Sequence, residues 1–133
     1  MTGEPLHVVL GPGSTMGGVA PLIADAVEWN RTLYLSGRAD VDPATLEPRS
    51  RDFAGQTRSV LRDIGQVLEE SGSSLASVLR VECYLARAED FGDWNAIFAE
   101  TFSAPRPART TLVAGFTVPG LLVEIQVTAA VTR

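Results

Sequence analysis

The spacing of hydrophobic and polar residues along the chain predicts an ordered succession of strands and helices. In the first part of the sequence, short apolar runs bounded by Gly, Pro or Asn favour strands at residues 7–11, 25–29 and 32–37. Asn30 and Arg31 separate the second run from the third, which predicts an antiparallel hairpin with a tight turn. These three runs are expected to be the first three strands of a sheet.

Two segments are predicted to be loops. Residues 11–18 are rich in glycine, but they lack the Gly-Lys-Ser/Thr ending of a phosphate-binding loop and lead to Pro21 rather than into a helix. They are interpreted as a flexible loop that can cover a neighbouring part of the molecule. Residues 40–48 contain two Xaa-Pro turns and are expected to form a second loop.

The hydrophobic period changes from two residues to between three and four at Asp52, which predicts a helix. Asp52 can cap its start, and Gly72 can terminate it. A second amphipathic helix of about three turns is predicted from Phe91 to Phe102. The two helices are expected to pack their apolar stripes against the same sheet.

Residues 78–86, between the two helices, alternate strictly and predict a fourth strand. Its apolar face is expected to carry Leu79, Val81, Cys83 and Leu85, and its polar face Arg80, Glu82 and Tyr84. Cys83 is therefore interpreted as a buried structural thiol rather than a nucleophile. Because it is the only cysteine, no intrachain disulfide can form.

The C-terminal segment predicts a β-hairpin that carries a cation and a carboxylate on neighbouring strands. Pro105 and Pro107 disfavour helix, Thr-Thr-Leu-Val follows, Val-Pro-Gly at 118–120 can turn the chain, and the segment after it alternates like a strand. Arg109 and Glu124 are expected on the polar face of this hairpin. In bulk water the pair would be an ordinary ion pair worth less than about 1 kcal/mol.

The order β-β-β-α-β-α-β-β predicts an α+β fold, with an about six-stranded mixed sheet and two helices on one face. The other face is expected to carry Arg80, Glu82, Tyr84, Arg109, Glu124 and Gln126 beside scattered apolar residues. This mixture is too polar for a core and too organised for a plain solvent face. We therefore expect this face to pack against another copy of the chain, with pockets between the subunits.

The composition is that of an ordinary soluble globular protein, and residues 1–133 are expected to form a single domain. Hydrophobic residues make up 45% and charged residues 20% of the chain, which excludes the disordered and membrane classes. The N-terminus shows no leader pattern, so a cytoplasmic location is expected. A net charge of -5 without a basic stripe argues against a nucleic-acid partner.

The sequence contains few of the residues that bind metals or act as activated nucleophiles. His7 is the only histidine and Cys83 the only cysteine, so no metal site is expected. A Ser-His or Cys-His nucleophile system is not expected either, because it would have to use the same single histidine.

The segment from Val81 to Leu112 resembles the signature of the reactive-intermediate deaminase family, RidA, also called YjgF. The resemblance lies in a strand followed by Asp-Phe, Asn, Phe and then Pro-Ala-Arg-Thr-Thr. Residues 33–37 (LYLSG) and 123–131 (VEIQVTAAV) look like the other two signatures of the family. The resemblance covers most of the chain from about residue 25, and it implies a chorismate-mutase-like fold assembled as a homotrimer with clefts at the subunit interfaces.

The resemblance also implies roles for individual residues. Arg109 would hold a substrate carboxylate and Glu124 would serve a water or a proton, while Ser36, Gly37 and the backbone of Thr111 would line the cleft. The implied reaction is hydrolysis of a 2-imino acid such as 2-iminopropanoate or 2-iminobutanoate, by water attack on the C=N carbon. This chemistry needs no cofactor, and the only partner besides further copies of the chain is a small carboxylate-bearing substrate.

Three positions depart from the family pattern. Leu22 stands where a tyrosine is common, so Tyr34 or Tyr84 would have to supply the aromatic hydroxyl. Arg38 stands where glutamine is common, and this second positive charge could suit a larger or more acidic substrate. Thr111 stands where cysteine is frequent.

These departures leave two alternatives to a generic deaminase open. One is an enzyme that hydrolyses, tautomerises or cyclises an intermediate of a particular biosynthetic pathway. The other is a ligand-binding regulatory trimer without turnover.

Overall fold

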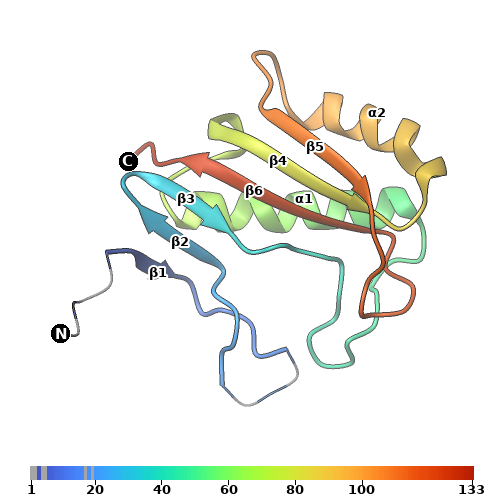
Figure 1. The fold of residues 1–133 in the computed structure, drawn as a ribbon, viewed down its shortest axis with the longest axis horizontal. Helices are drawn as coiled ribbons and strands as arrows, with labels where there is room; N and C mark the ends of the chain where they lie inside the picture. The colour runs from blue at the N-terminus through green and yellow to red at the C-terminus, as the bar shows by residue number, and fades with distance from the viewer. Residues whose placement is uncertain (1–2, 4–5, 17, 19) are drawn as a thin grey trace.

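The computed structural model describes residues 3, 6–16, 18 and 20–133, which form a six-stranded sheet covered on one face by two helices (Figure 1). The elements are β1 (Val8–Leu10), β2 (Ala26–Trp29), β3 (Thr32–Leu35), α1 (Phe53–Glu70), β4 (Val78–Leu85), α2 (Phe91–Thr101), β5 (Ala108–Val113) and β6 (Val123–Ala130). Their order along the chain confirms the predicted succession. Gly17 of the predicted glycine-rich loop lies outside the described residues, as do four of the first five residues.

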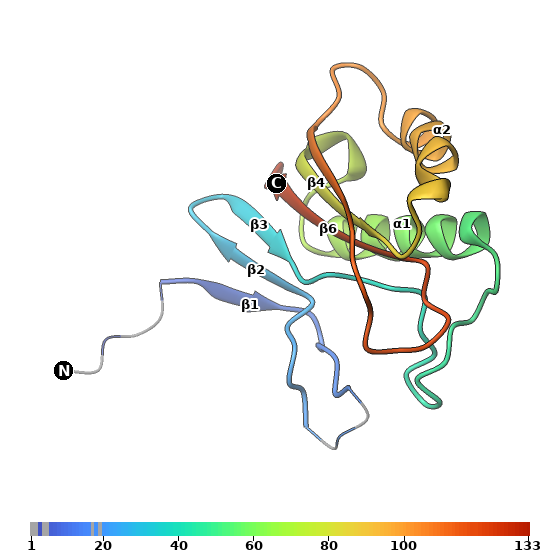
Figure 2. The same ribbon diagram turned by 45° about the vertical axis from the view of Figure 1, so that its right-hand side comes forward.

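The strands lie in the order β1-β2-β3-β6-β4-β5, and only the β4–β5 pair is parallel. The sheet is therefore mixed, as predicted. The turned view in Figure 2 places both helices behind the same face and leaves the opposite face uncovered. We call this uncovered surface the open face.

Local sequence signals determine where α1 begins and ends. The Asp52 side chain accepts a hydrogen bond from the backbone N–H of Gly55 at 2.9 Å, as expected for an N-cap. Gly72, with φ at +81°, follows the last turn in a conformation that favours glycine. No helix in the described part of the chain is long and apolar enough to cross a membrane.

The core lies between the helices and the covered face of the sheet. The central strand β6 contributes alternate buried side chains, from Val123 through Ile125 and Val127 to Ala129. They meet the buried stripe of α1, in which Val60, Ile64 and Leu68 are fully buried. Each aliphatic side chain of this size contributes about 1.5–3 kcal/mol when it leaves water, so this layer supplies much of the stability of the fold.

A β-bulge alters the predicted faces of β4 at its start. The register with β6 shifts between Val78 and Arg80, so Val78 is buried and Leu79 is 52% exposed. The prediction that Leu79 belongs to the apolar face is therefore wrong, because a bulge inserts one residue and interrupts strict alternation. From Val81 onward the alternation holds, and Cys83 is buried as predicted.

The predicted C-terminal hairpin is not formed, because β4 lies between β5 and β6. The chain does turn where the sequence predicted it, with Gly120 at φ +86°. This turn belongs to the connection over residues 114–122, which carries the chain past β4 to its far side. The local turn signal was correct, whereas the pairing depended on β4, a partner from elsewhere in the sequence.

Candidate active site

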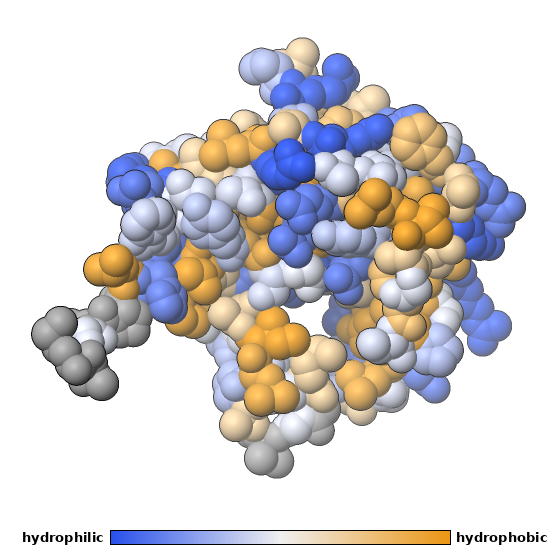
Figure 3. Space-filling view, viewed as in Figure 1, coloured by the Kyte–Doolittle hydropathy of each residue, from blue (hydrophilic) through white to orange (hydrophobic). Residues whose placement is uncertain are grey.

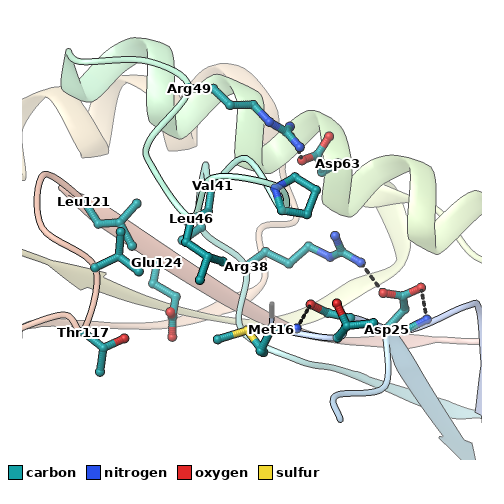
Figure 4. Close-up of a pocket in the computed structure, with 16 residues that line it drawn as sticks. Met16, Asp25, Arg38, Val41, Leu46, Arg49, Asp63, Thr117, Leu121 and Glu124 are labelled. Atoms are coloured by element: carbon teal, nitrogen blue, oxygen red, sulfur yellow. Dashed lines mark hydrogen bonds and ion pairs between the residues drawn. The ribbon is translucent and has the colours of Figure 1, made fainter. Parts of the chain in front are cut away.

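Glu124, on β6, lines a pocket of about 410 Å³ (Figure 4). Three loops supply most of the other walls, over residues 13–16, 38–49 and 117–121. In the space-filling view, the surface is hollowed in this region between the loops (Figure 3). The site is thus built where the end of a central strand meets loops from distant parts of the chain.

The carboxylate of Glu124 is partly withdrawn from water, and this burial raises its pKa above the usual range. No arginine or histidine of the described residues lies within ion-pair distance of it. A half-buried carboxylate without a cation is a stronger base than an exposed one. The direction of this pKa change is the one that a carboxylate needs to act as a general base.

Gly37, which was predicted with Ser36 to line a substrate cleft, lies directly beside this carboxylate. A Cβ at Gly37 would stand 2.7 Å from Oε2 of Glu124, so a larger residue there would displace the carboxylate from its present position. The Ser36 hydroxyl donates to the carbonyl of Ala24 at 2.6 Å. This bond ties the end of β3 to the segment before β2, and Ser36 is not among the residues that line the pocket.

Arg38 also reaches the pocket, but its charge is already neutralised. Its Nη2 lies 2.7 Å from Oδ1 of Asp25. The Arg38 backbone forms a two-way bridge with Ile125, the residue after Glu124, at 2.8 and 2.9 Å. Sequence reasoning missed Asp25, because a single aspartate at the start of a strand shows no sign of the arginine that it contacts.

Tyr84 is the tyrosine nearer to Glu124 in the sheet. The two residues are direct partners in the register of β4 and β6, whereas Tyr34 is paired with Thr128 further along β6. Partial burial raises the pKa of Tyr84, and its hydrogen bond to Glu82 raises it further. Its hydroxyl therefore remains protonated and donates to Glu82 at 3.2 Å, on the strand next to Glu124.

Arg109 lies on the opposite face of the sheet from Glu124, which corrects the prediction that they share a polar face. It is in register with Val81, a fully buried residue of the covered face. Its guanidinium carbon lies 4.9 Å from the ring centroid of Phe98 and 5.6 Å from that of Phe91. Because β5 pairs in parallel with β4 from Ala108 onward, the register with β4 decides which face Arg109 occupies.

The guanidinium of Arg109 has no ion-pair partner within the described ranges of the chain. The aromatic rings of α2 support its flat side, an interaction worth about 0.5–2 kcal/mol depending on exposure. Thr111, two residues on, accepts a hydrogen bond from Nε1 of Trp94 at 3.1 Å. Helix α2 therefore fixes both side chains, while the hydrogen-bonding edge of the guanidinium is not engaged by another side chain of the described residues.

Other reactive groups are poorly placed for chemistry. Burial raises the pKa of the Cys83 thiol to about 12, despite the opposing effect of the nearby Arg109 charge, so the thiolate is not populated near neutral pH. His7 is exposed before β1. The described part of the chain contains no group of three or more His, Cys, Asp or Glu side chains placed to hold a metal ion.

The fold and the site together define an α+β protein. Its pocket contains a carboxylate, Glu124, that has no ion-pair partner among the described residues, and Arg109 lies on the opposite face of the sheet. Residues 16–131 match the family model described as Endoribonuclease L-PSP. The chain therefore belongs to this family, to which proteins named RidA and YjgF are also related.

Named relatives agree with this assignment. A RutC family protein from Pyrococcus horikoshii is 34% identical over 80% of this chain and 84% of its own length. A 2-iminobutanoate/2-iminopropanoate deaminase from Homo sapiens is 27% identical over 91% of this chain and 88% of its own. The crystal structure of RidA from an Antarctic Psychrobacter superposes with a TM-score of 0.77 at 28% identity, covering 92% of this chain and 98% of that one. The resemblance drawn from the sequence is thereby confirmed.

Proposed function

We propose that the protein is an imine deaminase that hydrolyses 2-imino acids to 2-oxo acids and ammonia. The observation that carries this proposal is the Glu124 carboxylate, which is half-buried in a pocket, free of any cation among the described residues and raised in pKa. A general base of this kind suits water attack on an electrophilic C=N carbon. The human relative named as a 2-imino acid deaminase supports the same reaction class.

We further infer that the complete site needs a second copy of the chain. Arg109 and Glu124 of one chain lie on opposite faces of the sheet, so a small substrate cannot reach both. The open face carries exposed Leu112, Tyr34 and Trp29 among its polar residues. Because β5 is an edge strand of the sheet, a homotrimer that packs this face would place Arg109, at the β5 edge of one subunit, against the pocket of the next.

The roles of the two residues follow from their chemistry. The fork of Arg109 binds the substrate carboxylate through two parallel hydrogen bonds and places the C=N carbon near the pocket. Glu124 removes a proton from a water as its oxygen adds to that carbon, and it delivers the proton to the nitrogen. The resulting carbinolamine then gives up its hydroxyl proton to Glu124, which passes it to the amino group as the C–N bond breaks and the C=O bond forms, so ammonia and the 2-oxo acid leave. These steps need only acid–base groups, and Tyr84 on the neighbouring strand is a further proton donor.

A pathway-specific reaction on the same site is the second candidate. It is favoured by the pocket volume of about 410 Å³, which falls in the range of sites for larger ligands rather than four-carbon acids. Leu22, 76% exposed, also leaves the segment near the pocket without an aromatic hydroxyl. Hydrolysis, tautomerisation or cyclisation of a larger imine or enamine would use the same acid–base groups.

The decisive experiment supplies 2-iminobutanoate from a threonine dehydratase and measures ammonia release. The wild-type protein at micromolar concentration should accelerate release over buffer. Arg109→Lys keeps the charge but loses the fork, so kcat/KM should fall by about 30- to 150-fold, roughly 2 to 3 kcal/mol. Glu124→Gln should lower turnover by about 100-fold or more and leave affinity for the 2-oxo acid nearly intact.

Matched controls come from an exposed ion pair on the helices. Arg58 and Glu100 lie 3.3 Å apart outside the pocket, so Arg58→Lys and Glu100→Gln should keep the wild-type rate. An unchanged rate of ammonia release in the presence of wild-type protein would exclude the generic deaminase.

A further inference from the structure

The most unusual feature of the pocket is the ion pair between Asp25 and Arg38. The side chains are 14% and 28% exposed, so the pair is largely shielded from water. The second carboxylate oxygen of Asp25 accepts the backbone N–H of Gly13 at 3.1 Å, as the dashed lines in Figure 4 show. Asp25 thus holds both the arginine and the glycine-rich loop at the pocket wall.

The position of Arg38 depends on this contact with Asp25. Its Nε atom is buried without a hydrogen-bond partner in the described part of the chain. Leaving a buried donor unsatisfied is unfavourable, which opposes this placement of the side chain. The contact at 2.7 Å with Asp25 offsets that cost. Without the Asp25 carboxylate, the Arg38 guanidinium would be free to bind another anion, such as a carboxylate of a ligand.

Charge pairing leaves the pocket without a free cation among the described residues. Arg38 is paired with Asp25, and the second arginine of the lining, Arg49, has its Nη1 3.7 Å from Oδ2 of Asp63. Glu124 is the remaining charged group of the lining. The described lining therefore carries three carboxylates and two arginines, and a second negative charge brought in by a ligand would meet net repulsion.

We propose that Asp25 is a specificity-determining residue that, by engaging Arg38, restricts the pocket to ligand tails without a negative charge. The inference rests on the proposed function for its choice of ligand, an acid whose own carboxylate is held by Arg109. This inference reverses the expectation that Arg38 suits a more acidic substrate, because the Arg38 guanidinium already forms an ion pair with Asp25. A ligand of the preferred class is a 2-imino or 2-oxo monocarboxylate with an uncharged or cationic tail.

The test compares two 2-oxo acids that differ in tail charge, 2-oxopentanoate and 2-oxoglutarate, by calorimetric titration of the assembled protein. The wild type should bind 2-oxopentanoate at least about tenfold more tightly. Asp25→Asn frees Arg38, so affinity for 2-oxoglutarate should rise by about tenfold or more while affinity for 2-oxopentanoate changes little. Asp25→Glu keeps the charge and should retain the wild-type preference.

Two further variants keep the test decisive. Arg38→Gln leaves Asp25 without its cation, so 2-oxoglutarate should bind still more weakly than to the wild type. Asp93→Asn removes the same charge from an exposed position of α2 outside the pocket, and it should leave the preference unchanged. Arg38→Gln also supplies an answer if Asp25→Asn does not fold.

The outcomes separate this inference from the proposed function. Equal losses of affinity for both acids in Asp25→Asn would show a purely structural role and overturn the inference. So would a wild type that prefers 2-oxoglutarate or binds neither acid. Failure of the wild type to hydrolyse any imine, with the preference switching as expected, would reject the deaminase and leave the specificity role of Asp25 standing.

Discussion

Glu124 shows how one residue can be costly to the fold and useful to a reaction. Its carboxylate is desolvated without a compensating cation among the described residues, and the physical consequence is a raised pKa. In the folded state the protonated form is therefore favoured more than in the unfolded chain. Stability from this group is present at low pH and is lost as pH rises through the raised pKa.

Glu124→Gln should consequently raise the melting temperature at pH 7. The amide has nearly the same shape but carries no charge, so the desolvation cost of the ionised carboxylate disappears. Near pH 4 the wild-type carboxyl is largely protonated in the folded state, and the difference between the two proteins should shrink. Calorimetric melting temperatures from pH 4 to pH 8 measure this convergence.

Glu100→Gln provides the comparison for this pH series, because Glu100 is exposed on α2 and pairs with Arg58 at the surface. A melting-temperature gain for Glu124→Gln that is as large at pH 4 as at pH 7 would show that ionisation of Glu124 carries no cost in the fold.

At the scale of elements, the position of Arg109 depends on how α2 docks against β5. Trp94 is fully buried, and its indole N–H donates to the Thr111 hydroxyl at 3.1 Å. The same helix presents Phe91 and Phe98 to the guanidinium of Arg109. One helix–strand contact thus supports both the fold and the proposed carboxylate-binding residue.

Thr111→Val should destabilise the protein by about 1–3 kcal/mol, because it leaves the buried indole N–H of Trp94 without an acceptor while conserving shape. The free energy of unfolding from urea titration measures the change. Thr128→Val makes the same replacement on the open face of β6, where no hydrogen bond of the side chain is found among the described residues, and it should cost less than about 0.5 kcal/mol. Equal costs for the two variants would rule out the indole hydrogen bond as the cause.

At the scale of the whole molecule, Arg109 and Glu124 lie on opposite faces of one sheet, so they can act on one substrate only if they come from two different subunits. If the site forms between subunits, each site takes its arginine from one chain and its carboxylate from another. Activity then belongs to the interface and can be divided between two defective chains.

Mixing Arg109→Ala and Glu124→Gln subunits by joint unfolding and refolding should therefore restore activity. In a random trimer, about a quarter of the interfaces combine an intact arginine with an intact glutamate, so about a quarter of the wild-type rate is expected. Light scattering should give a mass three times the 14.2 kDa of one chain. A mixture no more active than its two components would place both residues in the same chain's site.

The sequence by itself determined the features that depend on neighbours along the chain. The period of three to four residues, Asp52 and Gly72 predicted α1 because caps and amphipathic stripes act within a few residues. The pair Asn30-Arg31 predicted the β2–β3 hairpin in the same way. The signature from Val81 to Leu112 identified the family before any coordinates, and the alternation of the last strand singled out Glu124 as a polar residue between buried neighbours.

Only the tertiary structure decided which strands are neighbours and which face each site residue occupies. The insertion of β4 between β5 and β6 placed Arg109 against α2 and away from Glu124, and the bulge at Val78 exposed Leu79. The contact of Asp25 with Arg38 joins residues 13 positions apart, at the two ends of the β2–β3 hairpin. Strand pairing and ion pairs of this kind depend on the packing of distant segments. Alternation along one strand shows which residues share a face, but it does not show which of the two faces the helices cover.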